Sequence, residues 1–347
     1  MTGTAVRQLA TARGCLLGLL LGDAIGAVAG TVPIDGPLRS TSAGQLACFT
    51  VEGVIRANLR STHRGICHSA SVVRHAYTRW AALQGAPGIH RWREDHWPDG
   101  WLAQVPAIAA HRGTAPATVS ALQRHAFVGS TDHPDWTSTG AHALTRTLPV
   151  GLTAWWGGQA GRYAGDLAAT THAPEAVDAA LVGAAVVAGA GRSGNVATAV
   201  AQARQEGQEL VRVMPGTTLS AAVEAADERP RRADVLTQLA PDGRAASALA
   251  GGVYVALSFP ERGRLRDALL LAGSVPHGEH VAATAGAILG SAHGVDALPL
   301  ELVSRLELAW VADVLARDLV AEFTDSPAGN GYRPAADPEW LTRYPGW

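Results

Sequence analysis

The side chains best suited to chemistry gather in one short segment, His277-Gly278-Glu279-His280. Two imidazoles and a carboxylate can transfer protons near neutral pH, and together they can bind a single metal ion such as zinc. We therefore take His277, Glu279 and His280 as candidate catalytic residues. Their spacing is not one of the common metal-binding patterns, so the alternative is that they only cap the helix that follows.

The element behind this segment is a run of very small residues, 282–290. Such small side chains predict a helix that starts near Gly278 and lies close against its neighbours in the centre of a bundle. Glu279 then falls in the first turn, where the helix dipole favours an anion. Glycines occupy every fourth position at Gly14, Gly18, Gly22, Gly26 and Gly30. They form a smooth ridge that predicts a second central helix, with Asp23 near its end.

Apolar residues recur at helical spacing along most of the chain, and no segment shows a convincing strand period. We predict an all-α protein, a multi-helix bundle that forms a single domain over residues 1–323. Residues 324–347 lose the helical period and are predicted to be an irregular tail, docked by Trp340 and Trp347. Besides the two central helices, the predicted helices cover 42–59, 71–83, 118–127, 175–190, 195–213, 219–226, 245–257, 265–272 and 300–323.

Composition excludes several classes of protein. The chain has 347 residues, is 47% hydrophobic and carries a net charge of -2, which predicts neither nucleic-acid nor membrane binding. All 28 basic residues are Arg, so a P-loop lysine and a Schiff-base lysine are excluded. Three cysteines, Cys15, Cys48 and Cys67, are too few for a disulfide framework and fit a reducing compartment.

The amino terminus has some features of a signal peptide. Arg7 and Arg13 precede the apolar run 15–21, but Asp23 interrupts the region that would have to be apolar. The run is also too short for a membrane span. We therefore expect a cytoplasmic protein.

Two further groups of residues have a structural and a functional interpretation. His172 precedes a predicted helix and either caps it or faces a cleft. The loop 90–101 contains Trp92, Trp97 and Trp101, which either anchor the loop to the bundle or stack on a ligand.

Taken together, five segments resemble the ADP-ribosylglycohydrolase (DraG-like) family, and they occur in the family's order over roughly the first three hundred residues. The resemblance implies an all-α fold with a binuclear magnesium or manganese site that removes ADP-ribose from modified proteins or small molecules. The matching segments are Arg13-Gly14-Cys15-Leu16-Leu17-Gly18 through Gly22-Asp23-Ala24-Ile25-Gly26, Gln45-Leu46-Ala47 with Phe49-Thr50-Val51-Glu52-Gly53, Gly140-Ala141-His142-Ala143-Leu144-Thr145-Arg146 with Pro149-Val150-Gly151-Leu152, Thr171-His172, and Ala285-Gly286-Ala287-Ile288-Leu289-Gly290.

The chain departs from the family at the metal motifs. The family's Thr-Asp-Asp-Thr is matched by Thr41-Ser42-Ala43-Gly44, and its Asp-x-Asp-Ser/Thr by His277-Gly278-Glu279-His280. The acid expected after the opening helix falls near Gly30. Because two hard cations need several carboxylates, the resemblance implies a degenerate metal site, and we expect no metal cofactor. The ligand-binding residues that it implies are Asp23, Thr41, Ser42, His142, Arg146 and His172.

Three hypotheses about function follow. The chain is a binding or regulatory protein that has lost ADP-ribose hydrolysis and takes an ADP-ribose-like ligand or a protein partner. Alternatively, it is a repurposed enzyme that uses His277, Glu279 and His280, helped by His172 or Asp132, for metal-free acid/base chemistry or with one zinc ion. As a third possibility, it is a structural partner whose cleft is filled with side chains.

Overall fold

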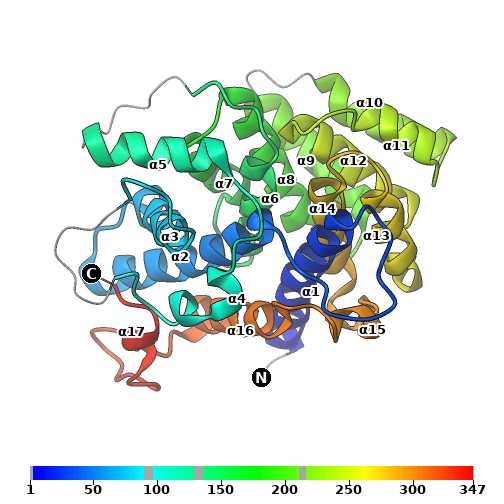
Figure 1. Ribbon diagram of the computed structural model, residues 1–347. Coiled ribbons are helices and arrows are strands. Elements are labelled where there is room, and N and C mark those ends of the chain that lie inside the picture. Colours follow the sequence, from blue (N-terminus) through cyan, green and yellow to red (C-terminus); the bar gives the residue numbers. More distant parts are fainter. Residues whose placement is uncertain (1–2, 90–96, 129–135, 211–215, 347) are drawn as a thin grey trace.

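The computed structural model describes residues 3–89, 97–128, 136–210 and 216–346. Within these ranges the chain folds almost entirely into helices, and its extended pairings are three isolated bridges. The helices form one mass in Figure 1, with the N-terminus at its bottom and the C-terminus on its left-hand side. The predicted all-α class is therefore confirmed.

Seventeen α-helices lie in the described part of the chain: α1 Gly3–Ala27, α2 Ser42–Arg64, α3 Ser69–Leu83, α4 Pro106–Ala109, α5 Pro116–Val128, α6 His142–Thr147, α7 Ala160–Ala169, α8 Pro174–Ser193, α9 Val196–Leu210, α10 Gly216–Glu228, α11 Ala233–Leu239, α12 Ala245–Ser258, α13 Leu265–Gly273, α14 Gly278–His293, α15 Leu300–Val303, α16 Ala309–Asp325 and α17 Trp340–Arg343. Four 3-10 helices accompany them: η1 Leu102–Gln104, η2 Leu148–Trp156, η3 Arg262–Arg264 and η4 Val295–Ala297.

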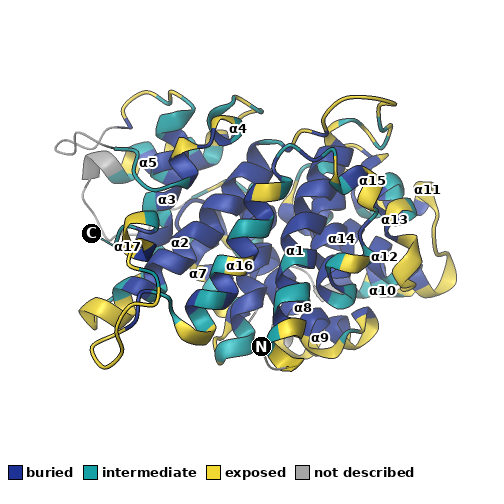
Figure 2. Cartoon of the chain, turned by 90° about the horizontal axis from the view of Figure 1, so that it is seen from below, coloured by how far each residue is buried: buried dark blue, intermediate teal, exposed yellow. Residues whose placement is uncertain are grey.

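The two predicted central helices, α1 and α14, lie side by side in the buried middle of the molecule (Figures 1 and 2). A methyl group added at Gly18 would lie 2.3 Å from the carbonyl oxygen of Gly286, and one at Gly22 would lie 2.0 Å from that of Ala282. Side chains larger than hydrogen are therefore excluded unless the helices separate. This seam also fixes the site, because Gly26 at the end of α1 touches the backbone of Glu279 at the start of α14.

One predicted helix is wrong in its extent. The pattern over 300–323 predicts a single helix, whereas the structure has α15, a turn over 304–308, and then α16. The interruption occurs where the backbone pairs with a distant segment: Leu38 N donates to Arg305 O at 2.8 Å, and Glu307 N donates to Leu38 O at 2.9 Å. Tertiary pairing therefore overrides the apolar period.

Before the carboxyl-terminal segment, four short helices lie where the sequence analysis predicts none: α4, α6, α7 and α11. The helix predicted over 195–213 is present as α9, and its last three predicted residues lie outside the described ranges. The remaining predicted helices are present, with ends that differ by a few residues.

The segment after α16 packs back onto that helix, on the lower left of Figure 1. Trp340 Nε1 donates to Glu322 Oε2 at 3.0 Å, and Tyr344 OH donates to Asp318 Oδ2 at 2.5 Å. Trp340 thus docks the segment as predicted, while Trp347 lies outside the described residues. Within the predicted irregular tail, α17 is one short helix.

Two helices, α1 and α8, are long and apolar enough to cross a membrane if length and composition alone are considered. In each of them 83% of the apolar window is buried inside the bundle. Core helices of a bundle have the same pattern.

Candidate functional site

The three candidate catalytic residues lie at the start of α14, but they do not point to one place. His277 precedes the helix with a left-handed φ of 56°, and its exposed ring covers Gly243, where an added methyl group would lie 3.2 Å from Nδ1. His280 is buried, and its Nε2 lies 3.9 Å from Oε1 of the partly exposed Glu279. Among the described residues, no group of three or more His, Cys, Asp or Glu side chains is arranged to hold a metal ion.

The structure instead brings His280 to His142, which stands at the beginning of α6. Their rings meet edge to face with centroids 4.9 Å apart, and Thr145 Oγ1 lies 2.9 Å from His280 Nδ1. Burial and, to a smaller extent, the charge of Arg146 lower the pKa of His142 to about 4. Burial also holds the pKa of His280 well below its usual value, with smaller contributions from His142 and His277. Both imidazoles are therefore neutral at pH 7.

His172 and Arg146 join the same cluster through a threonine. Arg146 is fully buried, and its Nη2 donates at 2.5 Å to Thr171 Oγ1, which lies 2.7 Å from His172 Nδ1. Arg146 also donates to Thr118 Oγ1 at 2.9 Å and stacks over Tyr77, with 4.3 Å from Cζ to the ring centroid. Burial, together with the charge of Arg146 and the neighbouring His142, keeps the pKa of His172 well below its usual value. Three of the predicted ligand-binding residues thus form one buried group.

Asp23 and Thr41 form the second part of the site. The buried Asp23 carboxylate accepts hydrogen bonds from the backbone N and from Oγ1 of Thr41, both at 2.6 Å. Thr41 is the N-cap of α2, since its Oγ1 also accepts from Ala43 N at 3.0 Å. Burial raises the pKa of Asp23 to about 7 against the Thr41 hydrogen bonds, and the charge of Glu279 adds to the rise. Both carboxylate oxygens therefore serve to join α1 to α2.

Ser42, in the first turn of α2, is covered by another segment of the chain. We call residues 110–115 the strap. Ser42 N donates to Arg112 O at 3.0 Å, and Ser42 Oγ donates to Thr114 O at 3.3 Å. The backbone of Thr114 also hydrogen-bonds to His142. The strap therefore lies over both parts of the site, and only 3% of Ser42 is exposed.

The binuclear cation site that the resemblance implies does not fit these residues. Ala43 and Gly44 have no side-chain donor atoms, and the Ser42 hydroxyl is bonded to the strap. A methyl group on Gly44 would lie 2.6 Å from Asp23 Oδ2, so a carboxylate-bearing side chain has no room at that position. One engaged carboxylate, one separate glutamate and neutral imidazoles lack the negative charge that two hard cations require.

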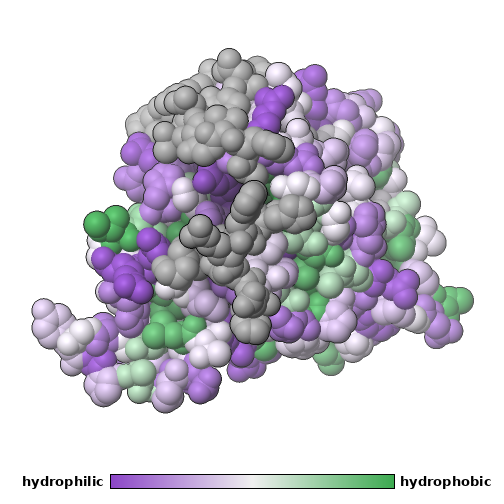
Figure 3. All heavy atoms as spheres, turned by 60° about the vertical axis from the view of Figure 1, so that its left-hand side comes forward, coloured by the Kyte–Doolittle hydropathy of each residue, from purple (hydrophilic) through white to green (hydrophobic). Residues whose placement is uncertain are grey.

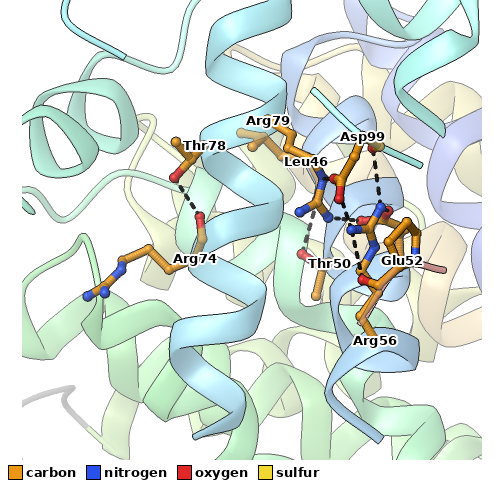
Figure 4. Close-up of polar contacts among 9 residues, drawn as sticks. Leu46, Thr50, Glu52, Arg56, Arg74, Thr78, Arg79 and Asp99 are labelled. Carbon is orange, nitrogen blue, oxygen red and sulfur yellow. Dashed lines mark hydrogen bonds and ion pairs between the residues drawn. The ribbon is translucent and has the colours of Figure 1, made fainter. Parts of the chain in front are cut away.

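The sequence analysis missed a buried charge network next to this site. Glu52 and Arg56 of α2, Arg79 of α3 and Asp99 form ion pairs, with Arg56 Nη1 at 3.0 Å from Asp99 Oδ1 (Figure 4). The available signal was a Glu and an Arg spaced by four on the apolar face of a predicted helix. The network joins α2 to α3 and to the segment that carries Asp99.

Two pockets of about 250 and 360 Å³ lie elsewhere on the described surface. The smaller one lies beside Arg60, His68 and His75, and the larger one between α7, α8 and α9. Neither is lined by a residue of the predicted site. The face seen in Figure 3 has hydrophobic residues scattered among hydrophilic ones. Asp132 and Trp92, which the sequence analysis also singles out, lie outside the described residues.

Comparison with known proteins identifies the family of this chain. The family model described as ADP-ribosylglycohydrolase matches residues 4–328. A solved structure titled "ADP-ribosylglycohydrolase-related protein complex" is similar, with a TM-score of 0.64 and 20% sequence identity over 92% of this chain and 100% of that chain. No curated protein sequence matches. Because the family model covers nearly the whole chain, the protein belongs to the ADP-ribosylglycohydrolase family.

Proposed function

We propose that this chain is a family member without ADP-ribose hydrolase activity that acts as a binding or regulatory protein. One observation carries the proposal: Asp23, a buried carboxylate near the start of α2, accepts two hydrogen bonds from Thr41, while Ser42, Ala43 and Gly44 supply no acid. Among the described residues, no set of carboxylates is then available to hold a cation pair that orients a ribose or activates water.

The ligand that we propose is an ADP-ribose-like small molecule. Family membership supports this choice, and so does the cluster of His142, Arg146 and His172 behind the strap. Neutral imidazoles and a buried guanidinium suit hydrogen bonding to hydroxyl and phosphate oxygens. In the other form of the proposal, the chain binds a protein partner instead of a small molecule.

A hydrolysis assay tests the loss of activity. Purified protein with magnesium or manganese is incubated with ADP-ribosyl-arginine and with ADP-ribosyl-serine, and released ADP-ribose is measured. We expect no release above a protein-free blank. Release that disappears in Glu279→Ala would contradict the proposal, because it would mean that Glu279 still supports hydrolysis.

A thermal-shift titration with ADP-ribose tests the binding role, since a ligand that binds only the folded state raises the unfolding temperature. We expect a rise in the wild type that is lost in His172→Ala. His68→Ala is the matched control, because His68 caps α3 at the surface, away from the site. An equal rise in both variants would assign the ligand to another part of the molecule.

A repurposed enzyme is the second candidate, and the contact of His280 with Glu279 favours it. A neutral imidazole beside a carboxylate can accept a proton. Metal analysis separates its two forms: about one zinc per chain that is lost in His277→Ala supports a mononuclear site, and metal-free protein leaves acid/base chemistry. The exposed position of His277 over Gly243 gives the zinc form less support.

A further inference from the structure

The strap, residues 110–115, is held mainly by polar contacts. Gln45 Nε2 donates to Ala110 O at 2.8 Å, and the two Ser42 hydrogen bonds hold Arg112 O and Thr114 O. Ile108 on one side is buried and Ala115 at its end is buried, but none of the side chains from 109 to 114 is. Its backbone has no regular structure, and Gly113 has a φ of 114°, which a side chain would rarely adopt. Within residues 110–115 only the small side chain of Ala115 is buried, so little apolar area holds the segment closed.

An ion pair provides the main side-chain anchor of the strap. Arg112 contacts Glu307 with both ends of its guanidinium fork: Nε lies 3.2 Å from Oε2, and Nη2 lies 2.5 Å from Oε1. The side chains are 24% and 19% exposed, so the pair is shielded but still reached by water. A bidentate pair of this kind is stronger than an ordinary surface ion pair.

Glu307 lies in the turn between α15 and α16, which pairs with the segment that leads to the site. Its backbone N donates to Leu38 O at 2.9 Å, and Leu38 is followed by the residues that run into Thr41 and Ser42. The ion pair thus ties the strap to the same turn that positions the start of α2. Breaking it releases the strap without removing any contact between α1 and α14.

Groups that lie beneath the strap are polar, which is unusual for a surface that is permanently closed. Ser42 gives both its polar groups to strap carbonyls, and next to it Thr41 holds the buried Asp23. His142 contacts the strap through Thr114, and its Nδ1 is buried without a hydrogen-bond partner among the described residues. Water or a ligand can satisfy these groups once the strap moves.

We propose that the strap is a lid over the polar site at the start of α2, and that the Arg112–Glu307 ion pair is the latch that holds it closed. The role of the lid in gating a ligand rests on the proposed binding function. The opening motion of the strap does not depend on that function. The two claims are tested by separate measurements on the same variants.

Amide hydrogen exchange measured by mass spectrometry tests the opening. The Ser42 amide reports directly, because its acceptor is Arg112 O. In Arg112→Ala and in the more conservative Glu307→Gln, we expect exchange over residues 40–46 and 110–116 to rise roughly tenfold, because both variants weaken the charge-assisted hydrogen bonds of the latch. Exchange in α14 should stay unchanged.

The matched control is Arg333→Ala, which removes an exposed ion pair with Asp325 far along the chain. It should leave exchange over 40–46 as in the wild type. Unchanged exchange in both latch variants would overturn the lid. A rise that is equally large in α1 and α14 would also overturn it, because the ion pair would then support the whole fold.

Calorimetric titration with ADP-ribose tests the gate. A closed lid lowers apparent affinity in proportion to the open fraction, so a tenfold larger open fraction should tighten binding about tenfold. Equal affinity in the wild type and both latch variants would overturn the lid as a gate. If exchange rises locally but no variant binds ADP-ribose, the lid stands and the proposed ligand is wrong.

Discussion

At the scale of single residues, Asp23 joins two helices through one buried side chain. Its two oxygens accept both hydrogen bonds of Thr41, and Thr41 in turn caps α2. One acid therefore joins the end of α1 to the start of α2. Its charge is destabilised by burial, and the nearby carboxylate of Glu279 adds to this effect.

This environment predicts a pH-dependent stability. Burial raises the pKa of Asp23 from 3.8 to about 7, so the folded state binds its proton more tightly than the unfolded state. The contribution of Asp23 to stability is therefore present at low pH and is lost as pH rises from about 4 through about 7, by at most about 4 kcal/mol. Asp23→Asn does not titrate and should lack this loss.

Urea denaturation of the wild type and of Asp23→Asn at several pH values from 4 to 8 measures the difference directly. The free energy of unfolding of the wild type, relative to that of Asp23→Asn, should fall as pH rises. Comparing the two proteins cancels the buried histidines, whose lowered pKa values favour higher pH in both. A difference that does not vary with pH would show that Asp23 is ionised throughout.

At the scale of elements, the seam between α1 and α14 positions both halves of the site. Backbone atoms meet along it at glycines, so the end of α1 and the start of α14 are held in register. Asp23 and Glu279 are close enough to interact electrostatically for this reason. The strap adds a weaker element over the same site.

A single added methyl group should disturb this seam. In Gly18→Ala the new Cβ would lie 2.3 Å from Gly286 O, a backbone atom that cannot rotate away. Alanine gains about 1 kcal/mol of helix propensity, but overpacking costs more, and we expect a net loss of about 1 to 3 kcal/mol in the free energy of unfolding.

Gly3→Ala is the control on the same helix, because nothing lies within 4 Å of its added Cβ. Chemical denaturation of that variant should give a stability within about 0.5 kcal/mol of the wild type. If Gly18→Ala were as stable as Gly3→Ala, the close approach of the two helices would be wrong.

At the scale of the whole molecule, the carboxyl-terminal segment ties α16 to the rest of the bundle. Glu322 is buried and its oxygens accept from Asn58, Ser326 and Trp340. Arg343 stacks over Trp101 at 4.7 Å, and the carbonyl of Pro345 accepts from Arg56 in the buried charge network. Residues near the end of the chain therefore support α2, which carries the site.

Trp340→Ala should destabilise the protein by about 3 kcal/mol, because it leaves a cavity and removes a donor from a buried carboxylate. Tyr332→Ala is the control in the same segment, since Tyr332 is fully exposed. Thermal unfolding should show a lower transition temperature for the first variant alone. Equal transitions would mean that the segment is not anchored by Trp340.

The sequence by itself determined most of the helices and the absence of acidic side chains at positions 42–44. Helical period and small residues depend on neighbours along the chain, so they predicted α1, α14 and most other helices. The identity of Ser42, Ala43 and Gly44 is likewise a property of the sequence, and it predicted the lack of carboxylates without any coordinates.

Only the tertiary structure decided which groups meet. The turn between α15 and α16 exists because Leu38, far away in sequence, pairs with it. The contact of His142 with His280, the engagement of Asp23 by Thr41 and the strap over Ser42 also join distant segments. Local preferences cannot specify such partners, because a hydrogen bond or a buried charge depends on which surface the folded chain brings against it.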